Sequence, residues 1–235
     1  MIKHLDALIL CGGKGTRLRE ISGKAPKPMV CIGGKVFLDI MIEGLRKAGF
    51  KRIILGIGYR ARLIREYYKY HPVSGVEIVF CEEKAPLGTG GAVKKARRLI
   101  KSESFFVLNG DTFSKFNAQR MLRSFRRKKA KLLILLRKAK PAKEYGLITL
   151  DSRSRICGFN EKASSSQRGF VNGGVYLFSK KVFSQMPGRA RFSLEYDLFP
   201  RMCGKGLYGY KEAGPFIDIG TPERYLSAQK YLLKS

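Results

Sequence analysis

The chain has 235 residues, of which 44% are hydrophobic and 28% charged, a composition typical of a globular protein rather than a disordered one. No apolar run reaches the roughly 18 residues of a membrane-spanning helix. Asp6 interrupts the apolar N-terminal stretch, which disfavours a signal peptide. We therefore expect no transmembrane segment.

The charge is strongly positive, because 47 Lys and Arg residues outnumber 18 Asp and Glu residues and give a formal net charge of +29. Such a charge attracts polyanions, so nucleic acid is one candidate partner. The densest basic run, "RSFRRKKAK" at 123–131, follows a helical pattern with Leu122 and Phe125 on its inner side, without the interleaved aromatic residues that stack on bases. We therefore favour a solvated basic surface on a protein that handles anionic small molecules, with no specific nucleic-acid partner.

The five cysteines are scattered and form no Cys-x-x-Cys pair, and only two histidines are present. These counts disfavour a structural zinc site. Reduced thiols in a cytoplasmic protein are the better interpretation.

Short apolar runs alternate with amphipathic stretches through the first half of the chain, beginning with a buried strand at 5–10. In chain order, we expect further strands at 51–59, 76–80, 104–111 and 131–136, and helices at 36–50, 60–71, 90–101 and 117–130. Apolar strands that alternate with helices predict a mostly parallel sheet covered by helices, which is the α/β class.

The second half has a different pattern, because period-two stretches split by a turn predict an antiparallel hairpin at 145–162. Further strands are expected at 168–179 and 207–213, and helices at 192–203 and 221–234. No convincing linker separates the halves. We predict a single domain over 1–235, with a nucleotide-binding half at about 1–135 and an acceptor-binding half at about 136–235.

The first strand leads into the glycine-rich stretch "LCGGKGTRL" at 10–18. This stretch does not match the dinucleotide fingerprint, because Leu18 occupies the third glycine position, and it does not match the P-loop. Glycines still allow backbone N–H groups to approach an anion, and Lys14 and Arg17 would add positive charge there. A plain glycine-rich connection is the alternative.

A second basic element, "KAPKPM" at 24–29, places Lys27 between Pro26 and Pro28. Both prolines restrain the backbone around this lysine, so its ammonium group can be directed at a fixed point. A surface lysine that only aids solubility is the alternative.

These two elements are followed, in order, by "PLGTGGA" at 86–92, "VLNGDTF" at 107–113, "YG" at 145–146, "EK" at 161–162, "NGGVYLF" at 172–178 and "FIDIGTPERY" at 216–225. The series resembles the sugar-nucleotide pyrophosphorylases, nucleotidyltransferases that join a sugar 1-phosphate to a nucleoside triphosphate. The resemblance covers essentially the whole chain. Within that family, the motifs are most similar to those of the D-glycero-D-manno-heptose 1-phosphate guanylyltransferases.

The resemblance implies a GT-A-like nucleotidyltransferase fold, with a Rossmann-like, mostly parallel sheet flanked by helices and a small antiparallel sugar-binding portion. It also implies that an oxygen of the sugar 1-phosphate attacks the α-phosphorus of the nucleotide, GTP being favoured, and that pyrophosphate leaves. The attacking oxygen is already anionic, so no Ser or Cys nucleophile is needed. The catalytic task is to hold two polyanions in line.

Asp111 and Asp218 each end an apolar stretch of the sequence. Oxygen ligands from separate segments suit Mg²⁺, which keeps several waters and bridges phosphates. The resemblance implies that these two aspartates hold this metal as a cofactor. Taken alone, Asp111 could be a turn-former and Asp218 a helix-entry carboxylate.

The resemblance also implies roles for residues in the other motifs. Arg17, Lys27 and Asp111 would be catalytic, with the two cations near the α-phosphate and the leaving pyrophosphate. The predicted nucleotide-binding residues are Leu10, Gly12, Gly13, Gly15, Thr16, Arg17, Lys27, Glu83, Pro86, Gly88, Thr89 and Gly110. The predicted sugar-phosphate-binding residues are Gly146, Glu161, Lys162, Asn172, Gly173 and Glu195.

The choice of base is a separate question. Guanine presents two donors on one edge, N1–H and the exocyclic amine, and a carboxylate accepts both. Glu82 and Glu83 are therefore candidates for selecting guanine, and an ion pair with Lys84 is the alternative role.

Other interpretations stay open. The substrates could be those of a mannose 1-phosphate guanylyltransferase, or of a thymidylyl- or uridylyltransferase acting on a glucose or amino-sugar 1-phosphate. A regulatory subunit that only binds is disfavoured, because it would not need paired metal carboxylates. The sequence leaves the sugar and the oligomeric state open, with a homodimer as one candidate, and it does not explain most of the positive charge.

Overall fold

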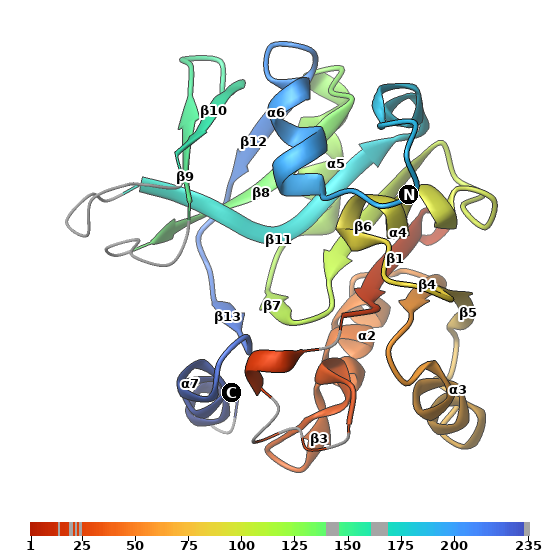
Figure 1. Cartoon of the computed structure of the whole chain (residues 1–235). Coiled ribbons are helices and arrows are strands. Elements are labelled where there is room, and N and C mark those ends of the chain that lie inside the picture. Colours follow the sequence, from red (N-terminus) through yellow and green to blue (C-terminus); the bar gives the residue numbers. More distant parts are fainter. Residues whose placement is uncertain are drawn as a thin grey trace.

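The computed structural model describes residues 1–13, 15–18, 21, 23, 25–139, 146–160 and 169–232, with only the backbone at Thr16, Ala139, Asn160 and Leu232. Its main feature is a nine-stranded sheet in the order β10-β9-β11-β6-β1-β4-β5, to which β8 adds by pairing with β11 and β12 by pairing with β8. Helices cover both faces of this sheet (Figure 1).

The parallel part of the sheet comes from the first half of the chain. It consists of β1 (Asp6–Cys11), β4 (Arg52–Ile57), β5 (Glu77–Glu82) and β6 (Ser104–Asn109). β1 pairs in parallel with both β4 and β6, and β4 pairs in parallel with β5. Consecutive residues of β1 are fully buried, as expected for a strand covered on both faces. The predicted α/β class is confirmed.

The two faces of the sheet have separate apolar cores. One core includes the inner sides of α2 (Phe37–Lys47), α3 (Ala61–Tyr70) and α5 (Ala118–Arg127). The other includes α4 (Gly88–Ala96) and α6 (Phe199–Met202).

Helix α5 accounts for a large part of the basic run. Leu122 and Phe125 are buried in the core, which confirms the inner side expected from the sequence, whereas Arg123, Arg126 and Arg127 are exposed. The helix therefore supports the interpretation of this run as a solvated basic face.

The second half of the chain extends the same sheet in antiparallel fashion. β11 (Gly169–Ser179) pairs antiparallel with β6 and with β8 (Leu132–Ala139), and β9 (Leu147–Leu150) forms the expected hairpin with β10 (Ile156–Asn160). The register between β11 and β8 shifts between Asn172 and Tyr176. The segment between them, which contains two glycines, therefore bulges out of the ladder. β12 (Leu207–Lys211) pairs in parallel with β8.

The helix expected at 192–203 is shorter and irregular. A π turn at Leu194–Leu198 precedes the single turn of α6, which carries Pro200 in its first turn. Three short 3₁₀ turns lie at Ile2–His4, Thr16–Leu18 and Lys27–Met29, and a longer one lies at Lys180–Gln185.

Two short antiparallel ladders lie outside the main sheet among the described residues. β2 (Cys31–Ile32) pairs with β3 (Lys35–Val36). β7 (Thr112–Ser114) pairs antiparallel with β13 (Phe216–Asp218), which places Asp218 opposite Thr112. α7 (Pro222–Leu232) begins after a three-residue turn at 219–221. The β7–β13 ladder therefore brings together two segments that are about a hundred residues apart in the chain.

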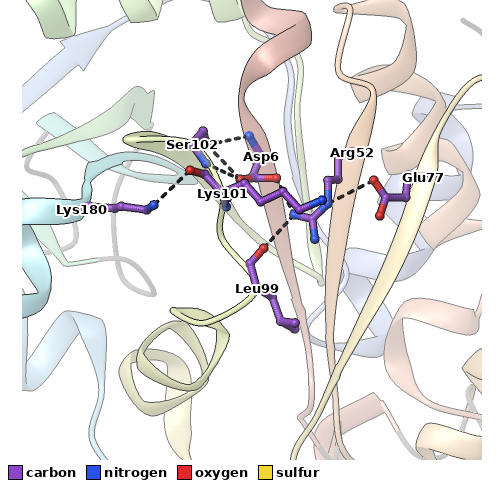
Figure 2. A network of polar contacts seen from close by, with 7 residues as sticks. All are labelled: Asp6, Arg52, Glu77, Leu99, Lys101, Ser102 and Lys180. Carbon is purple, nitrogen blue, oxygen red and sulfur yellow. Dashed lines mark hydrogen bonds and ion pairs between the residues drawn. The ribbon is translucent and has the colours of Figure 1, made fainter.

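The amino ends of the parallel strands are held by a buried carboxylate (Figure 2). Asp6, the first residue of β1, accepts hydrogen bonds from the guanidinium of Arg52 at 2.6 Å and from the backbone N–H groups of Lys101 and Ser102 at 2.7 and 2.8 Å. Arg52 also donates to the carbonyl of Leu99 at 2.8 Å. This network ties the loop before β6 to β1 and β4.

The same hydrogen bonds set the charge state of Asp6. Although burial alone would raise the pKa of Asp6, the hydrogen bonds from Ser102, Arg52 and Lys101 hold it below the ordinary value of 3.8. The depressed pKa stabilises the fold above the ordinary pKa, and this contribution is lost as the pH falls through the lower folded-state value.

We predict that Asp6→Asn lowers the free energy of unfolding by about 3 kcal/mol at pH 7, because it removes the buried carboxylate partner of Arg52 and leaves only the exposed carboxylate of Glu77, at 3.2 Å. Urea denaturation measures this. The deficit should shrink in acid, where Asp6 of the parent protein is itself protonated. Glu43→Gln, which breaks an exposed ion pair with Arg46, is the control and should leave the unfolding midpoint unchanged. An equal effect of both variants would contradict the prediction.

Candidate active site

A cavity of about 610 Å³ opens at the carboxyl ends of β1 and β6, the edge at which parallel sheets bind ligands. Every predicted nucleotide-binding residue lines it except Thr16, whose side chain lies outside the described residues. Asp111 lines the same cavity. Arg17 is exposed at the end of the glycine-rich loop. Lys14, the other cation considered for this loop, lies outside the described residues.

The glycines of the opening loop allow close packing around the cavity. A Cβ atom on Gly12 would lie 2.9 Å from a carboxylate oxygen of Glu83, and one on Gly15 would lie 2.9 Å from the Cβ of Lys27. Gly15 also has φ of +58°, a conformation that favours glycine. The loop is therefore shaped to fit directly against Glu83 and Lys27.

Lys27 and Asp111 form an ion pair at the floor of the cavity. The Lys27 Nζ atom donates to Asp111 Oδ2 at 2.6 Å, and the Thr112 hydroxyl donates to Asp111 Oδ1 at 3.0 Å. Lys27 is buried on a 3₁₀ turn between its two prolines. A buried lysine needs such a partner, because an unpaired buried charge is strongly unfavourable.

The β7–β13 ladder places Asp218 beside this ion pair. Its Oδ2 atom accepts a hydrogen bond from the Arg224 guanidinium at 2.6 Å, and its Oδ1 atom accepts the N–H of Gly220. Burial raises the pKa of Asp218, and the nearby Asp111 carboxylate raises it further, while Lys27 acts in the opposite direction. The two aspartates therefore repel each other across a short distance.

The chemistry of these two carboxylates fits a divalent cation. Two oxygen-donor groups from separate segments converge, and a cation between them would relieve the effect that raises the Asp218 pKa. In the part of the chain that the structure describes, no group of three or more His, Cys, Asp or Glu side chains could hold a metal ion. Water and phosphate oxygens would have to complete the coordination, as is usual for Mg²⁺.

The two candidate carboxylates for base selection have different surroundings. Glu82 is exposed and forms an ion pair with Arg65 at 2.7 Å. Glu83 lines the cavity, and its Oε2 atom accepts the N–H of Leu87 at 3.1 Å. Burial raises the pKa of Glu83. Of the two, only Glu83 lines the cavity.

Part of the "PLGTGGA" motif has a packing role. Gly90 and Gly91 donate their N–H groups to the carbonyl of Phe192 at 3.0 and 3.2 Å, and a Cβ on Gly90 would lie 2.2 Å from the Phe192 ring. The close approach of Phe192 is the reason for glycine at position 90, while Gly88 and Thr89 line the cavity.

The predicted sugar-phosphate residues are only partly described. Glu161 and Lys162 lie outside the described residues, and Gly146 is exposed at the start of β9. Asn172 precedes the β11 bulge, and a Cβ on Gly173 would lie 3.0 Å from the carbonyl oxygen of Leu135. None of these described residues lines the cavity itself.

Glu195, the remaining predicted sugar-phosphate residue, contacts Thr89, which lines the cavity. Its carboxylate accepts hydrogen bonds from the hydroxyls of Thr89 and Ser193 at 2.7 and 2.8 Å. The structure therefore brings Glu195 to the first turn of α4 and the cavity wall.

Sequence reasoning missed three polar residues at the site. Arg191 and Asn109 line the cavity, and Arg224 pairs with Asp218. Asn109 lies within the "VLNGDTF" motif, and its place in that motif could have marked it as a site residue. Arg224 lies six residues after Asp218 in "FIDIGTPERY", and its role depends on the turn into α7.

Comparison with known proteins gives the family. The model of a family described as nucleotidyl transferase matches residues 6–235. The D-glycero-alpha-D-manno-heptose 1-phosphate guanylyltransferase of Campylobacter jejuni is 37% identical over 228 residues, which cover 94% of this chain and 97% of that protein. The protein of the same name from Aneurinibacillus thermoaerophilus is 39% identical, with 97% of this chain and 98% of that protein covered.

A second group of relatives is longer. The mannose-1-phosphate guanylyltransferase of Mycobacterium tuberculosis is 30% identical, and the match covers 98% of this chain but 65% of that protein.

Solved structures agree in fold. The crystal structure of HddC from Yersinia pseudotuberculosis superposes with a TM-score of 0.87 at 35% identity, covering 97% of this chain and 99% of HddC. HddC complexed with GMP-PN gives a TM-score of 0.86. Among the described helices, none has the length and apolar character needed to cross a membrane. The family model and the near-full-length relatives together show that the chain belongs to the nucleotidyl transferase family.

Proposed function

We propose that this protein is a D-glycero-D-manno-heptose 1-phosphate guanylyltransferase, which joins GTP and the heptose 1-phosphate into GDP-heptose and releases pyrophosphate. The observation that carries the proposal is the pair of relatives with this activity in their names, at 37% and 39% identity over nearly the whole chain. The complex of HddC with GMP-PN supports a guanine nucleotide as donor.

The cavity suits this chemistry. An oxygen of the sugar phosphate forms a new bond to the α-phosphorus, and the bond from that phosphorus to the β-phosphate oxygen breaks. Arg17 and Lys27 would bind the phosphate oxygens and hold the reacting groups in line. Asp111 and Asp218 would hold Mg²⁺, which supplies further charge neutralisation to the triphosphate. The attacking oxygen carries no proton that an enzyme base must remove.

Mannose 1-phosphate is the second candidate acceptor, because mannose-1-phosphate guanylyltransferases match this chain at 30–35% identity. A pyrophosphate-release screen that crosses four nucleoside triphosphates with heptose, mannose, glucose and amino-sugar 1-phosphates decides between them. We expect the highest kcat/KM for GTP with the heptose 1-phosphate. A higher value for another pair would replace the proposal, and no release with any pair would contradict it.

We predict that Asp111→Asn and Asp218→Asn each lower kcat by about a thousandfold or more, because each removes a metal carboxylate. Initial rates with varied MgCl₂ measure the effect, and excess chelator should abolish the activity of the parent enzyme until Mg²⁺ is restored. Asp151→Asn, at an exposed turn outside the cavity, is the control for a lost aspartate. Turnover at the parent rate in either site variant would remove the metal assignment.

We predict that Glu83→Gln reduces discrimination between GTP and ATP by about tenfold or more, because an amide cannot accept both guanine donors as a carboxylate does. The ratio of kcat/KM for the two nucleotides is the measurement. Glu82→Gln is the matched control, since its side chain faces solvent and Arg65. An unchanged ratio in Glu83→Gln, or an equal loss in Glu82→Gln, would show that Glu83 does not select the base.

Lys162 is proposed to bind the phosphate of the acceptor sugar. Lys162→Ala should therefore raise KM for the sugar 1-phosphate by about tenfold or more and change KM for GTP far less. Steady-state kinetics with each substrate varied in turn test this, with Lys205→Ala as a control at a turn before β12. Equal effects on both KM values would place Lys162 elsewhere.

A further inference from the structure

A chain of partly buried hydrogen bonds connects the cavity wall to the bulge in β11. Thr89, in the first turn of α4, donates its hydroxyl to Glu195 Oε2 at 2.7 Å. The Tyr176 hydroxyl donates to Glu195 Oε1 at 3.4 Å and accepts a hydrogen bond from the Asn172 side-chain amide at 2.9 Å. Asn172 Oδ1 accepts the N–H of Gly174 at 2.9 Å.

The direction of these bonds makes Glu195 the junction. The hydroxyls of Thr89, Ser193 and Tyr176 all donate to its two carboxylate oxygens. Because the Tyr176 proton is directed to Glu195, the Tyr176 oxygen is free to accept the Asn172 amide, and this fixes which way the amide points. Tyr176 is fully buried, where hydrogen bonds are stronger and reinforce one another.

We propose that Glu195 is a positioning residue that orients both substrate subsites at once, Thr89 on the nucleotide side and, through Tyr176, Asn172 on the sugar-phosphate side. The inference rests on the proposed function, because it takes Thr89 and Asn172 as contacts of the two substrates. It replaces the direct contact with the acceptor that the sequence led us to expect for Glu195.

The carboxylate is not needed to hold α4 against the neighbouring segment. The carbonyl of Phe192 accepts the N–H groups of Gly90 and Gly91, and the Lys94 ammonium donates to the carbonyls of Pro187 and Gly188 at 2.7 and 2.8 Å. These contacts fix the backbone independently of Glu195. What the carboxylate adds is the orientation of two polar side chains.

Three variants separate the branches of the network. Thr89→Val removes the hydroxyl on the nucleotide branch, Tyr176→Phe removes it on the sugar-phosphate branch, and Glu195→Gln disturbs the junction by introducing a donor where hydroxyls already donate. Tyr68→Phe is the matched control, because Tyr68 is a buried tyrosine that donates to the carboxylate of Asp39 at 2.8 Å outside the cavity.

The measurement is KM and kcat for each substrate, with a thermal melt for every variant. We expect Thr89→Val to raise mainly KM for GTP, Tyr176→Phe mainly KM for the sugar 1-phosphate, and Glu195→Gln both, each by about tenfold. Thr89→Ser should restore KM for GTP, and Tyr68→Phe should change neither KM. Because the residues act as one unit, Glu195→Gln combined with Tyr176→Phe should be no worse for the sugar 1-phosphate than Glu195→Gln alone.

Two results would overturn the inference. The first is a Glu195→Gln effect on KM for the sugar 1-phosphate alone, with Tyr176→Phe silent, since that is the pattern of direct contact with the sugar. The second is lowered melting temperature without any change in either KM, which is the pattern of a purely structural network. Failure of the proposed function would instead appear in the parent protein, as absence of pyrophosphate release with every substrate pair.

Discussion

The site depends on holding two carboxylates close together in a partly buried place. Like charges at short range repel, and burial makes each charge more costly. The β7–β13 ladder imposes this proximity, and each aspartate has its own cation, Lys27 for Asp111 and Arg224 for Asp218. Other features of the site match this arrangement, because the turn that presents Lys27 packs against Gly15 and the turn between β13 and α7 brings Arg224 back to Asp218.

The sequence was enough to predict the architecture but only part of the site. Alternation of apolar strands and amphipathic helices predicted the parallel sheet. Strands such as β1 are buried on both faces and therefore consist almost entirely of apolar residues, a pattern that is visible in the sequence. The three-residue β7–β13 ladder, which places Asp218 opposite the neighbour of Asp111, has no periodicity to detect, so the proximity of the two aspartates was expected only from the family resemblance. The role of Arg224 depends on a turn geometry that composition does not encode.

The glycine-rich motifs show the same limit. A glycine in the sequence indicates that another group packs closely against the backbone at that position, but it does not indicate which group. At Gly90 the neighbour is the Phe192 ring, whereas at Gly12 it is the carboxylate of Glu83. The positive charge is likewise visible in the sequence, whereas the position of one part of it, on the outer side of α5, follows from the burial of Leu122 and Phe125.

The pairing of each site aspartate with a resident cation has a consequence for how the protein is made. Carboxylates gathered to bind a metal would ordinarily oppose folding until the metal arrives, which links folding to the metal supply. Here the Asp111–Lys27 and Asp218–Arg224 pairs balance the charge within the polypeptide. If these aspartates hold Mg²⁺ as proposed, folding would not depend on the ion, which could then arrive together with the nucleotide.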